Sequence, residues 1–119
     1  MKKTLILGAS TNEERYAYKA AHKLSERKHE IIPVGIKRGE VAGKEIVNNK
    51  EIFKDIDTIT MYIGPKHQAD WQDYILKTNP KRIVFNPGTE NPELEAKAQA
   101  RGIETIEACT LVMLTIGNY

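Results

Sequence analysis

The residues with the clearest chemical potential lie near the N-terminus, where the apolar run 4–7 stops at Gly8. The small residues Ala9 and Ser10 follow, and a pattern of helical period begins at Glu13. This order is typical of a strand that passes through a tight turn into a helix. At such a junction, free backbone N–H groups and the positive end of the helix point to one place. The segment therefore predicts a site for phosphate or another anion.

Two basic residues, Lys37 and Arg38, follow the second apolar run, residues 31–36. A sheet that binds NAD usually carries a carboxylate there, and its first turn reads G-x-G-x-x-G. Here Ser10 and Glu13 stand in place of the second and third glycines. The sequence disfavours NAD and favours a ligand with a phosphate on its ribose. NADP and coenzyme A both meet that requirement.

Other chemistries have little support in the sequence. The sequence contains no recognisable Ser-His-Asp set, nucleophile elbow or pair of carboxylates. Metal-ligand spacing is also missing among the histidines and the single cysteine, so no metal site is predicted; these residues are His22, His29, His67 and Cys109. Cys109 is expected to be a small buried filler, and Trp71 and Tyr74 are expected to be core or interface residues.

Strands and helices alternate along the whole chain. Strands are predicted at residues 4–7, 31–36, 44–47, 59–63, 83–85 and 103–106, and Pro33 is expected at a strand end or bulge. Helices are predicted at 13–28, 70–77, 92–101 and 110–116, with a short helix or turn at 49–56. The pattern predicts a doubly wound α/β domain with a mainly parallel sheet of five or six strands and helices on both faces.

Composition sets limits on the class of protein. The chain has 119 residues, 29% of them charged, and a net charge of +2. This size suits one domain spanning residues 1–119, and the charge is too small to imply nucleic-acid binding. No apolar stretch approaches the roughly 20 residues that a membrane span needs. We expect a soluble cytoplasmic domain without nucleic-acid or membrane partners.

In a parallel sheet, the loops after the strands meet at one edge, where ligands bind. Those loops carry an ordered set of motifs: Gly8-Ala9-Ser10, Pro33-Val34 with a basic glycine loop, Gly64-Pro65, Asn86-Pro87-Gly88 and Cys109. The set covers nearly the whole chain and resembles the small stand-alone CoA-binding proteins. These are similar in turn to the CoA-binding domain of the succinyl-CoA synthetase α subunit. The resemblance implies a Rossmann-like fold that binds coenzyme A.

The resemblance also implies which residues contact the ligand. Phosphates would lie at the first turn, adenosine at the loop after the second strand, and the turn after the fourth strand would form a wall. The candidate CoA-binding residues are Gly8, Ala9, Ser10, Asn12, Arg15, Val34, Gly35, Lys37, Arg38, Ile63, Gly64, Pro65, Asn86 and Gly88. Two departures stand out. The family usually has Asn-Pro where this chain has Gly35-Ile36, and often a Trp-x-Gln-Gly-like motif where it has Phe85-Asn86-Pro87-Gly88.

The expected function is binding of coenzyme A or an acyl-CoA by a monomer or homodimer, without catalysis. The synthetase needs a second domain with a phosphorylated histidine, for which 119 residues leave no room. An NADP-dependent or other nucleotide-binding oxidoreductase is the alternative enzyme class. A regulatory protein that binds no small molecule is the third hypothesis.

Overall fold

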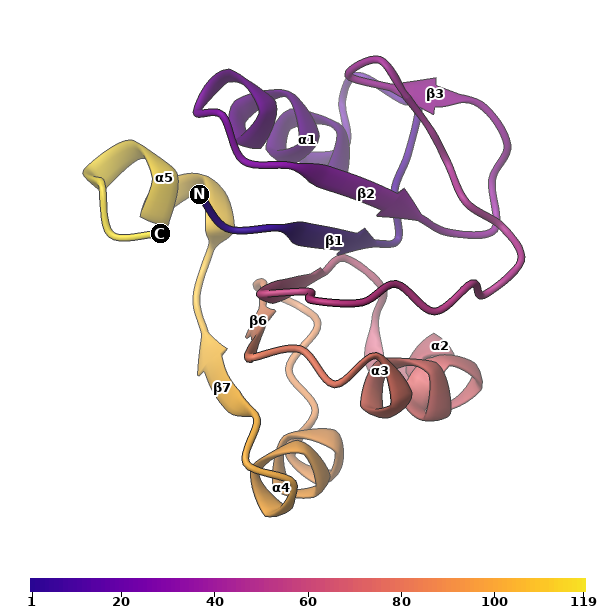
Figure 1. The fold of residues 1–119 in the computed structure, drawn as a ribbon, viewed down its shortest axis with the longest axis vertical. Helices are drawn as coiled ribbons and strands as arrows, with labels where there is room; N and C mark the ends of the chain where they lie inside the picture. Colours follow the sequence, from indigo (N-terminus) through magenta and orange to yellow (C-terminus); the bar gives the residue numbers. More distant parts are fainter.

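The computed structural model describes all residues from 1 to 119. Five parallel strands form one sheet in the order β2-β1-β5-β6-β7 (Figure 1). They are β1 (Thr4–Leu7), β2 (Ile31–Val34), β5 (Thr58–Met61), β6 (Arg82–Phe85) and β7 (Glu104–Glu107). All residues of β1, β2 and β5 are buried, which explains why these strands read as continuous runs instead of alternating patterns. The predicted parallel sheet is confirmed.

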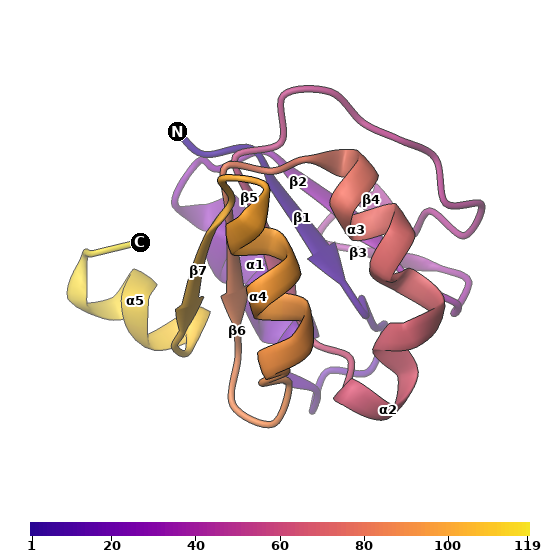
Figure 2. The same ribbon diagram turned by 90° about the horizontal axis from the view of Figure 1, so that it is seen from below.

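Helices cover both faces of this sheet, as predicted. They are α1 (Tyr16–Glu26), α2 (Pro65–Gln68), α3 (Gln72–Thr78), α4 (Pro92–Ala100) and α5 (Thr110–Ile116), with a 3₁₀ turn η1 (Ala69–Trp71) between α2 and α3. Helix α1 lies on one face and packs against α5, while α3 and α4 lie side by side on the other face (Figures 1 and 2). None of these helices is long and apolar enough to cross a lipid bilayer.

Residues 44–47 do not form the third strand of the sheet. Instead, β3 (Glu40–Val41) and β4 (Lys44–Glu45) make a separate antiparallel ribbon, and Val47 forms a single bridge to Val34. Strand β2 is the terminal strand in the order β2-β1-β5-β6-β7, and a proline is tolerated at such an edge position. Pro33 lies inside β2 rather than at a bulge, and its carbonyl accepts a hydrogen bond from the Val47 N–H at 2.9 Å.

Residues 49–56 do not form the short helix that was expected there as an alternative to a turn. Lys50 and Asp55 have positive φ angles of 54° and 60°, which an α-helix does not accommodate. The segment is held from α3, where the Tyr74 hydroxyl donates to the Glu51 carbonyl oxygen at 2.7 Å. Burial, the larger cause, raises the pKa of Tyr74 to about 12, with the Glu51 charge adding to it. Ile52 in this segment is 47% exposed.

Helix α1 begins three residues later than predicted, at Tyr16 instead of Glu13. The Asn12 side-chain oxygen accepts from the Glu14 N–H, and the Asn12 carbonyl accepts from the Arg15 N–H, so these residues form a turn of their own. The two glutamates therefore precede the helix, and no side chain caps its first turn. This late start leaves the N-terminus of α1 open.

The chain changes direction across the sheet between β1 and β5. From β1 it passes to β2 on one side, and it then returns to β5 on the other side of β1. The carboxyl ends of β1 and β5 therefore flank the topological switch point, where ligands of open α/β sheets bind.

Candidate functional site

A cleft of about 640 Å³ opens at this switch point. Its walls come from the loops after β1, β2, β5 and β6, from the start of α1 and from α2 with η1. The lining residues are Leu7, Gly8, Ala9, Ser10, Arg15, Tyr16, Ala17, Gly35, Ile36, Lys37, Tyr62, Ile63, His67, Asp70, Trp71, Pro87, Gly88 and Thr89. The volume falls in the range of small-molecule and cofactor sites.

Most of the residues predicted from the first two loops meet in this cleft. Among the candidates, Gly8, Ala9, Ser10, Arg15, Gly35, Lys37, Ile63 and Gly88 line it, whereas Asn12, Val34, Arg38, Gly64, Pro65 and Asn86 do not. The first set is the part of the sequence prediction that the structure brings together. Contact of any of these residues with a ligand remains a prediction.

Gly8 is required by a close approach of two loops. Its φ angle is +100°, and a Cβ atom added to it would lie 2.9 Å from both the carbonyl carbon of Tyr62 and the Cγ2 atom of Ile63. Contacts this short do not occur for a real side chain, so the loops after β1 and β5 touch only because Gly8 has none. Gly8 thus allows the loops after β1 and β5 to meet at the base of the cleft, which we call its floor.

The backbone N–H groups of Gly8 and Ala9 are not available to a ligand. Both donate to the carbonyl oxygen of Val34, at 2.9 and 3.0 Å. Contact of Gly8 and Ala9 with a phosphate therefore remains a prediction that does not rest on these two amides. Val34 is fully buried, and its carbonyl oxygen fixes the turn through these two hydrogen bonds.

The unpaired amides lie at the start of α1. The N–H groups of Tyr16, Ala17 and Tyr18 have no protein partner, because the first turn of a helix offers no backbone acceptor and no side chain caps this one. Tyr16 and Ala17 line the cleft. The positive end of the α1 dipole and its free donors therefore open into the cleft, an arrangement that attracts anions.

Two polar residues shape the turn before α1. The Ser10 side-chain oxygen accepts from the Asn12 N–H at 3.0 Å, and Asn12 in turn accepts from the Glu14 N–H at 2.9 Å. Ser10 is almost completely buried at the cleft wall. Asn12 is exposed and organises the turn from outside the cleft.

The basic charges divide between two hollows. Arg15 and Lys37 line the main cleft, but Arg38 lines a smaller hollow of about 270 Å³ beside Glu40 and Glu45. Arg38 therefore lies outside the cleft that Lys37 lines, whereas the prediction places both residues at one phosphate. Asn48 holds the loop in this arrangement, since its amide donates to the Gly35 and Lys37 carbonyl oxygens at 2.8 Å.

Asn86 is a structural residue beneath the cleft. Its side-chain amide donates to the Thr60 hydroxyl at 2.7 Å and to the Met61 carbonyl at 2.8 Å, and its side-chain oxygen accepts from the Thr110 N–H at 2.8 Å. Because its side chain is buried and already hydrogen-bonded, Asn86 has a structural role here, and its contact with a ligand remains a prediction. The residue joins β5, the loop after β6 and the start of α5.

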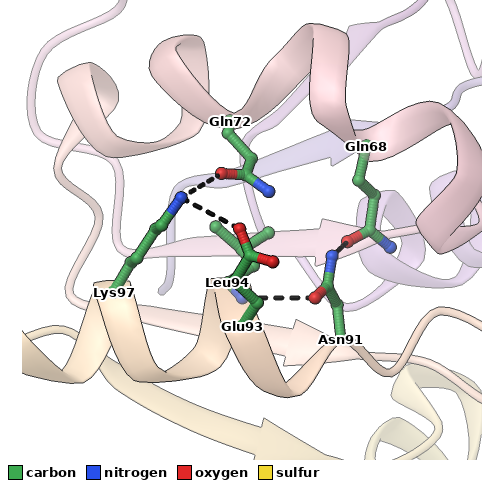
Figure 3. A network of polar contacts seen from close by, with 6 residues as sticks. All are labelled: Gln68, Gln72, Asn91, Glu93, Leu94 and Lys97. Atoms are coloured by element: carbon green, nitrogen blue, oxygen red, sulfur yellow. Dashed lines mark hydrogen bonds and ion pairs between the residues drawn. The ribbon is translucent and has the colours of Figure 1, made fainter.

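The far wall of the cleft consists mostly of residues outside the predicted set of binding residues. It contains Ile63 from the loop after β5, His67, Asp70 and Trp71 from α2 and η1, and Thr89 from the loop after β6. The position of these residues in the sequence could have predicted their place. Helix α2 begins directly after Gly64, so its first turns lie at the same edge of the sheet as the loops after the strands. Behind this wall, Gln68 joins α2 to the loop before α4 (Figure 3).

One hydroxyl beside the cleft has no partner. The Tyr62 side-chain oxygen is buried and makes no hydrogen bond, and burial is the main cause that raises the pKa of Tyr62 well above its ordinary value. The phenol is therefore neutral near pH 7. Cys109, expected to be buried, is only half-buried at the residue before α5. No cluster of three or more His, Cys, Asp or Glu side chains with metal-binding geometry is present.

Comparison with known proteins agrees with this architecture. The family model described as "CoA binding domain" matches residues 2–115. A crystal structure of an uncharacterized protein is 53% identical, with a TM-score of 0.98, and the match covers 100% of this chain and 98% of that one. No match exists among curated proteins.

Two archaeal proteins are more distant in sequence but share the fold. A hypothetical protein from Pyrococcus horikoshii is 27% identical with a TM-score of 0.83, over 93% of this chain and 80% of its own. A conserved hypothetical protein from Pyrococcus furiosus is 25% identical with a TM-score of 0.81, over 94% and 98%. The family match over nearly the whole chain, together with the open α1 terminus at the switch point of a parallel sheet, shows that this chain belongs to the CoA binding domain family.

Proposed function

We propose that the protein binds coenzyme A or an acyl-CoA in the switch-point cleft. The observation that carries the proposal is the uncapped N-terminus of α1, whose free N–H groups at Tyr16 and Ala17 face the cleft. Arg15 and Lys37 line the same cleft from two different loops. Free helix amides and basic side chains together suit a diphosphate.

The adenosine end is assigned to the loop after β2. There Ile36 is 82% exposed, and the Tyr16 side chain across the cleft is 67% exposed, so both offer apolar surface on which a base can pack. Lys37 is the nearby cation in the cleft for the ribose 3′-phosphate. Arg38 is no longer assigned to this phosphate because it lines the other hollow.

The pantetheine arm is assigned to the far wall. With the diphosphate at α1, the rest of the ligand has to cross the floor at Gly8 toward Ile63 and Thr89. The apolar side chains of Ile63 and Trp71 on that side suit a long, mostly neutral arm. The thiol or thioester would then lie near His67 and Trp71.

We also propose that binding occurs without catalysis. The support comes from the sequence, which has no legible triad, nucleophile elbow or carboxylate pair. Incubation with acetyl-CoA and a thiol reagent tests this directly. Release of free thiol above the uncatalysed rate, proportional to protein concentration, would show that the protein is an enzyme.

A thermal-shift series with matched ligands tests the binding proposal. At 100 times its dissociation constant, a ligand stabilises the native state by roughly 2.7 kcal/mol. Coenzyme A is expected to raise the melting temperature, dephospho-CoA to raise it less, and NADP to have no effect. A larger shift with NADP than with coenzyme A would favour the oxidoreductase alternative.

The two neighbouring cations provide a matched pair of variants. Lys37→Ala is expected to lower the affinity for coenzyme A about tenfold, because one hydrogen bond to a charged group is lost. The affinity for dephospho-CoA is expected to fall less. Arg38→Ala is expected to change neither affinity by more than about twofold, because its side chain lies in the other hollow. Isothermal titration measures both. A larger loss in the Arg38 variant would contradict the assignment of the 3′-phosphate to Lys37.

A further inference from the structure

Gln68 is the one fully buried amide side chain behind the far wall of the cleft. Its nitrogen donates to the carbonyl oxygen of Ile63 at 2.9 Å and to that of Thr89 at 2.8 Å. Ile63 and Thr89 belong to different loops, and both line the cleft. A single side chain thus ties together the two segments that form this wall.

The orientation of the Gln68 amide is fixed from the other side. Its oxygen accepts from the side-chain nitrogen of Asn91 at 2.8 Å, and the Asn91 oxygen accepts from the Leu94 N–H at the first turn of α4 (Figure 3). Helix α4 therefore anchors Asn91, Asn91 orients Gln68, and Gln68 holds the two wall carbonyls. All polar atoms of the Gln68 side chain are used within the protein, so no ligand contacts it through a hydrogen bond.

We propose that Gln68 is a positioning residue that sets the pantetheine-binding side of the cleft. The inference rests on the proposed function, because it assigns that side of the cleft to one part of coenzyme A. The wall faces the loop at Gly8, where an added Cβ would already lie 2.9 Å from Ile63. A shift of Ile63 therefore changes the close contact between this wall and the loop at Gly8. The free amides at the start of α1 lie outside the residues that Gln68 contacts.

Comparison of the whole ligand with its nucleotide half tests this role. Gln68→Met keeps the length of the side chain but removes both donors to the wall. Its affinity for coenzyme A is expected to fall about tenfold, which corresponds to roughly one hydrogen bond. Its affinity for adenosine 3′,5′-bisphosphate, which lacks the pantetheine arm, is expected to stay within about twofold of the wild type. Isothermal titration well below the melting temperature measures both.

Gln72 provides the matched control. It lies one turn further along the same face, and its side-chain oxygen accepts from Lys97 of α4 at 3.1 Å (Figure 3). Gln72 therefore links α3 to α4, much as Gln68 links α2 to the start of α4. It touches neither wall carbonyl and does not line the cleft. Gln72→Met is expected to leave both affinities unchanged.

Asn91→Ser tests the same chain of contacts with a milder change. Serine also caps helices, so α4 keeps its start, while the donor that orients Gln68 is lost. This variant is expected to lower the affinity for coenzyme A, but not that for the bisphosphate, by a smaller factor than Gln68→Met does. It replaces Gln68→Met if that variant does not fold. Equal losses for coenzyme A and the bisphosphate, or no loss for either, would overturn the positioning role. Failure of the wild-type protein to bind coenzyme A at millimolar concentration would instead overturn the proposed function.

Discussion

Replacing Asn86 with leucine is expected to lower the free energy of unfolding by about 3–5 kcal/mol. The substitution has similar volume, so the loss comes from hydrogen bonds rather than from a cavity. It leaves the Met61 carbonyl and the Thr110 N–H without their partner in a buried region. Each orphaned buried group costs about 1–3 kcal/mol. Urea denaturation followed by circular dichroism measures the change.

Asn48→Leu is the control for this prediction. Its side-chain nitrogen also donates to two carbonyl oxygens at 2.8 Å, but Asn48 is exposed. Water can replace its hydrogen bonds, so the expected loss is below about 1 kcal/mol. Similar losses in the Asn48 and Asn86 variants would contradict the buried structural role of Asn86.

Gly8→Ala is expected to destabilise the protein by about 2–4 kcal/mol and to abolish binding of coenzyme A. The new methyl group would lie 2.9 Å from the Tyr62 carbonyl carbon, a backbone atom that cannot rotate away. The positive φ angle of +100° adds conformational strain. Relief requires the loops after β1 and β5 to separate, which displaces both sides of the cleft. Denaturation and titration of the same preparation measure the two effects.

Gly43→Ala separates strain from steric contact. Gly43 also has a positive φ angle, +79°, but a Cβ atom there would meet nothing within 4 Å. Only the conformational cost of about 1 kcal/mol is expected, with unchanged affinity for coenzyme A. If Gly8→Ala were no worse than Gly43→Ala, the two loops would not be in the close contact described here.

Elements with strong local signals were predictable from the sequence. The Asn91-Pro92 start of α4 is confirmed, because a capping side chain followed by proline specifies a helix start without help from the rest of the fold. The buried parallel strands were predictable for a similar reason, since continuous apolar runs between helical patterns have few other solutions.

The start of α1 was not predictable from the same kind of signal. Glu13 and Glu14 suit the first turn of a helix by charge, and that preference placed the predicted start too early. In the structure, the hydrogen bond from the Glu14 N–H to Asn12 completes a separate turn. Residues 12–15 therefore form this turn instead of the first turn of α1, and the end of the helix is left open.

The roles of Asn86 and Gln68 depend on contacts between distant segments. Asn86 looks like a ligand-binding residue because it is polar and lies in a glycine-containing turn after a strand. Its side chain is instead hydrogen-bonded inside the protein to Thr60 and Thr110, which are 26 and 24 residues away. Gln68 bonds Thr89, 21 residues away, and nothing in its local sequence marks it as buried. Only the packed fold reveals such residues.

The most direct test of the central claim is a crystal structure of the protein with coenzyme A. The diphosphate oxygens are expected within about 2.7–3.2 Å of the backbone nitrogens of Tyr16 and Ala17. The 3′-phosphate should lie beside Lys37, and the pantetheine arm along Ile63 and Thr89. Coenzyme A bound with its diphosphate away from the start of α1, or at the hollow around Arg38, would contradict the account.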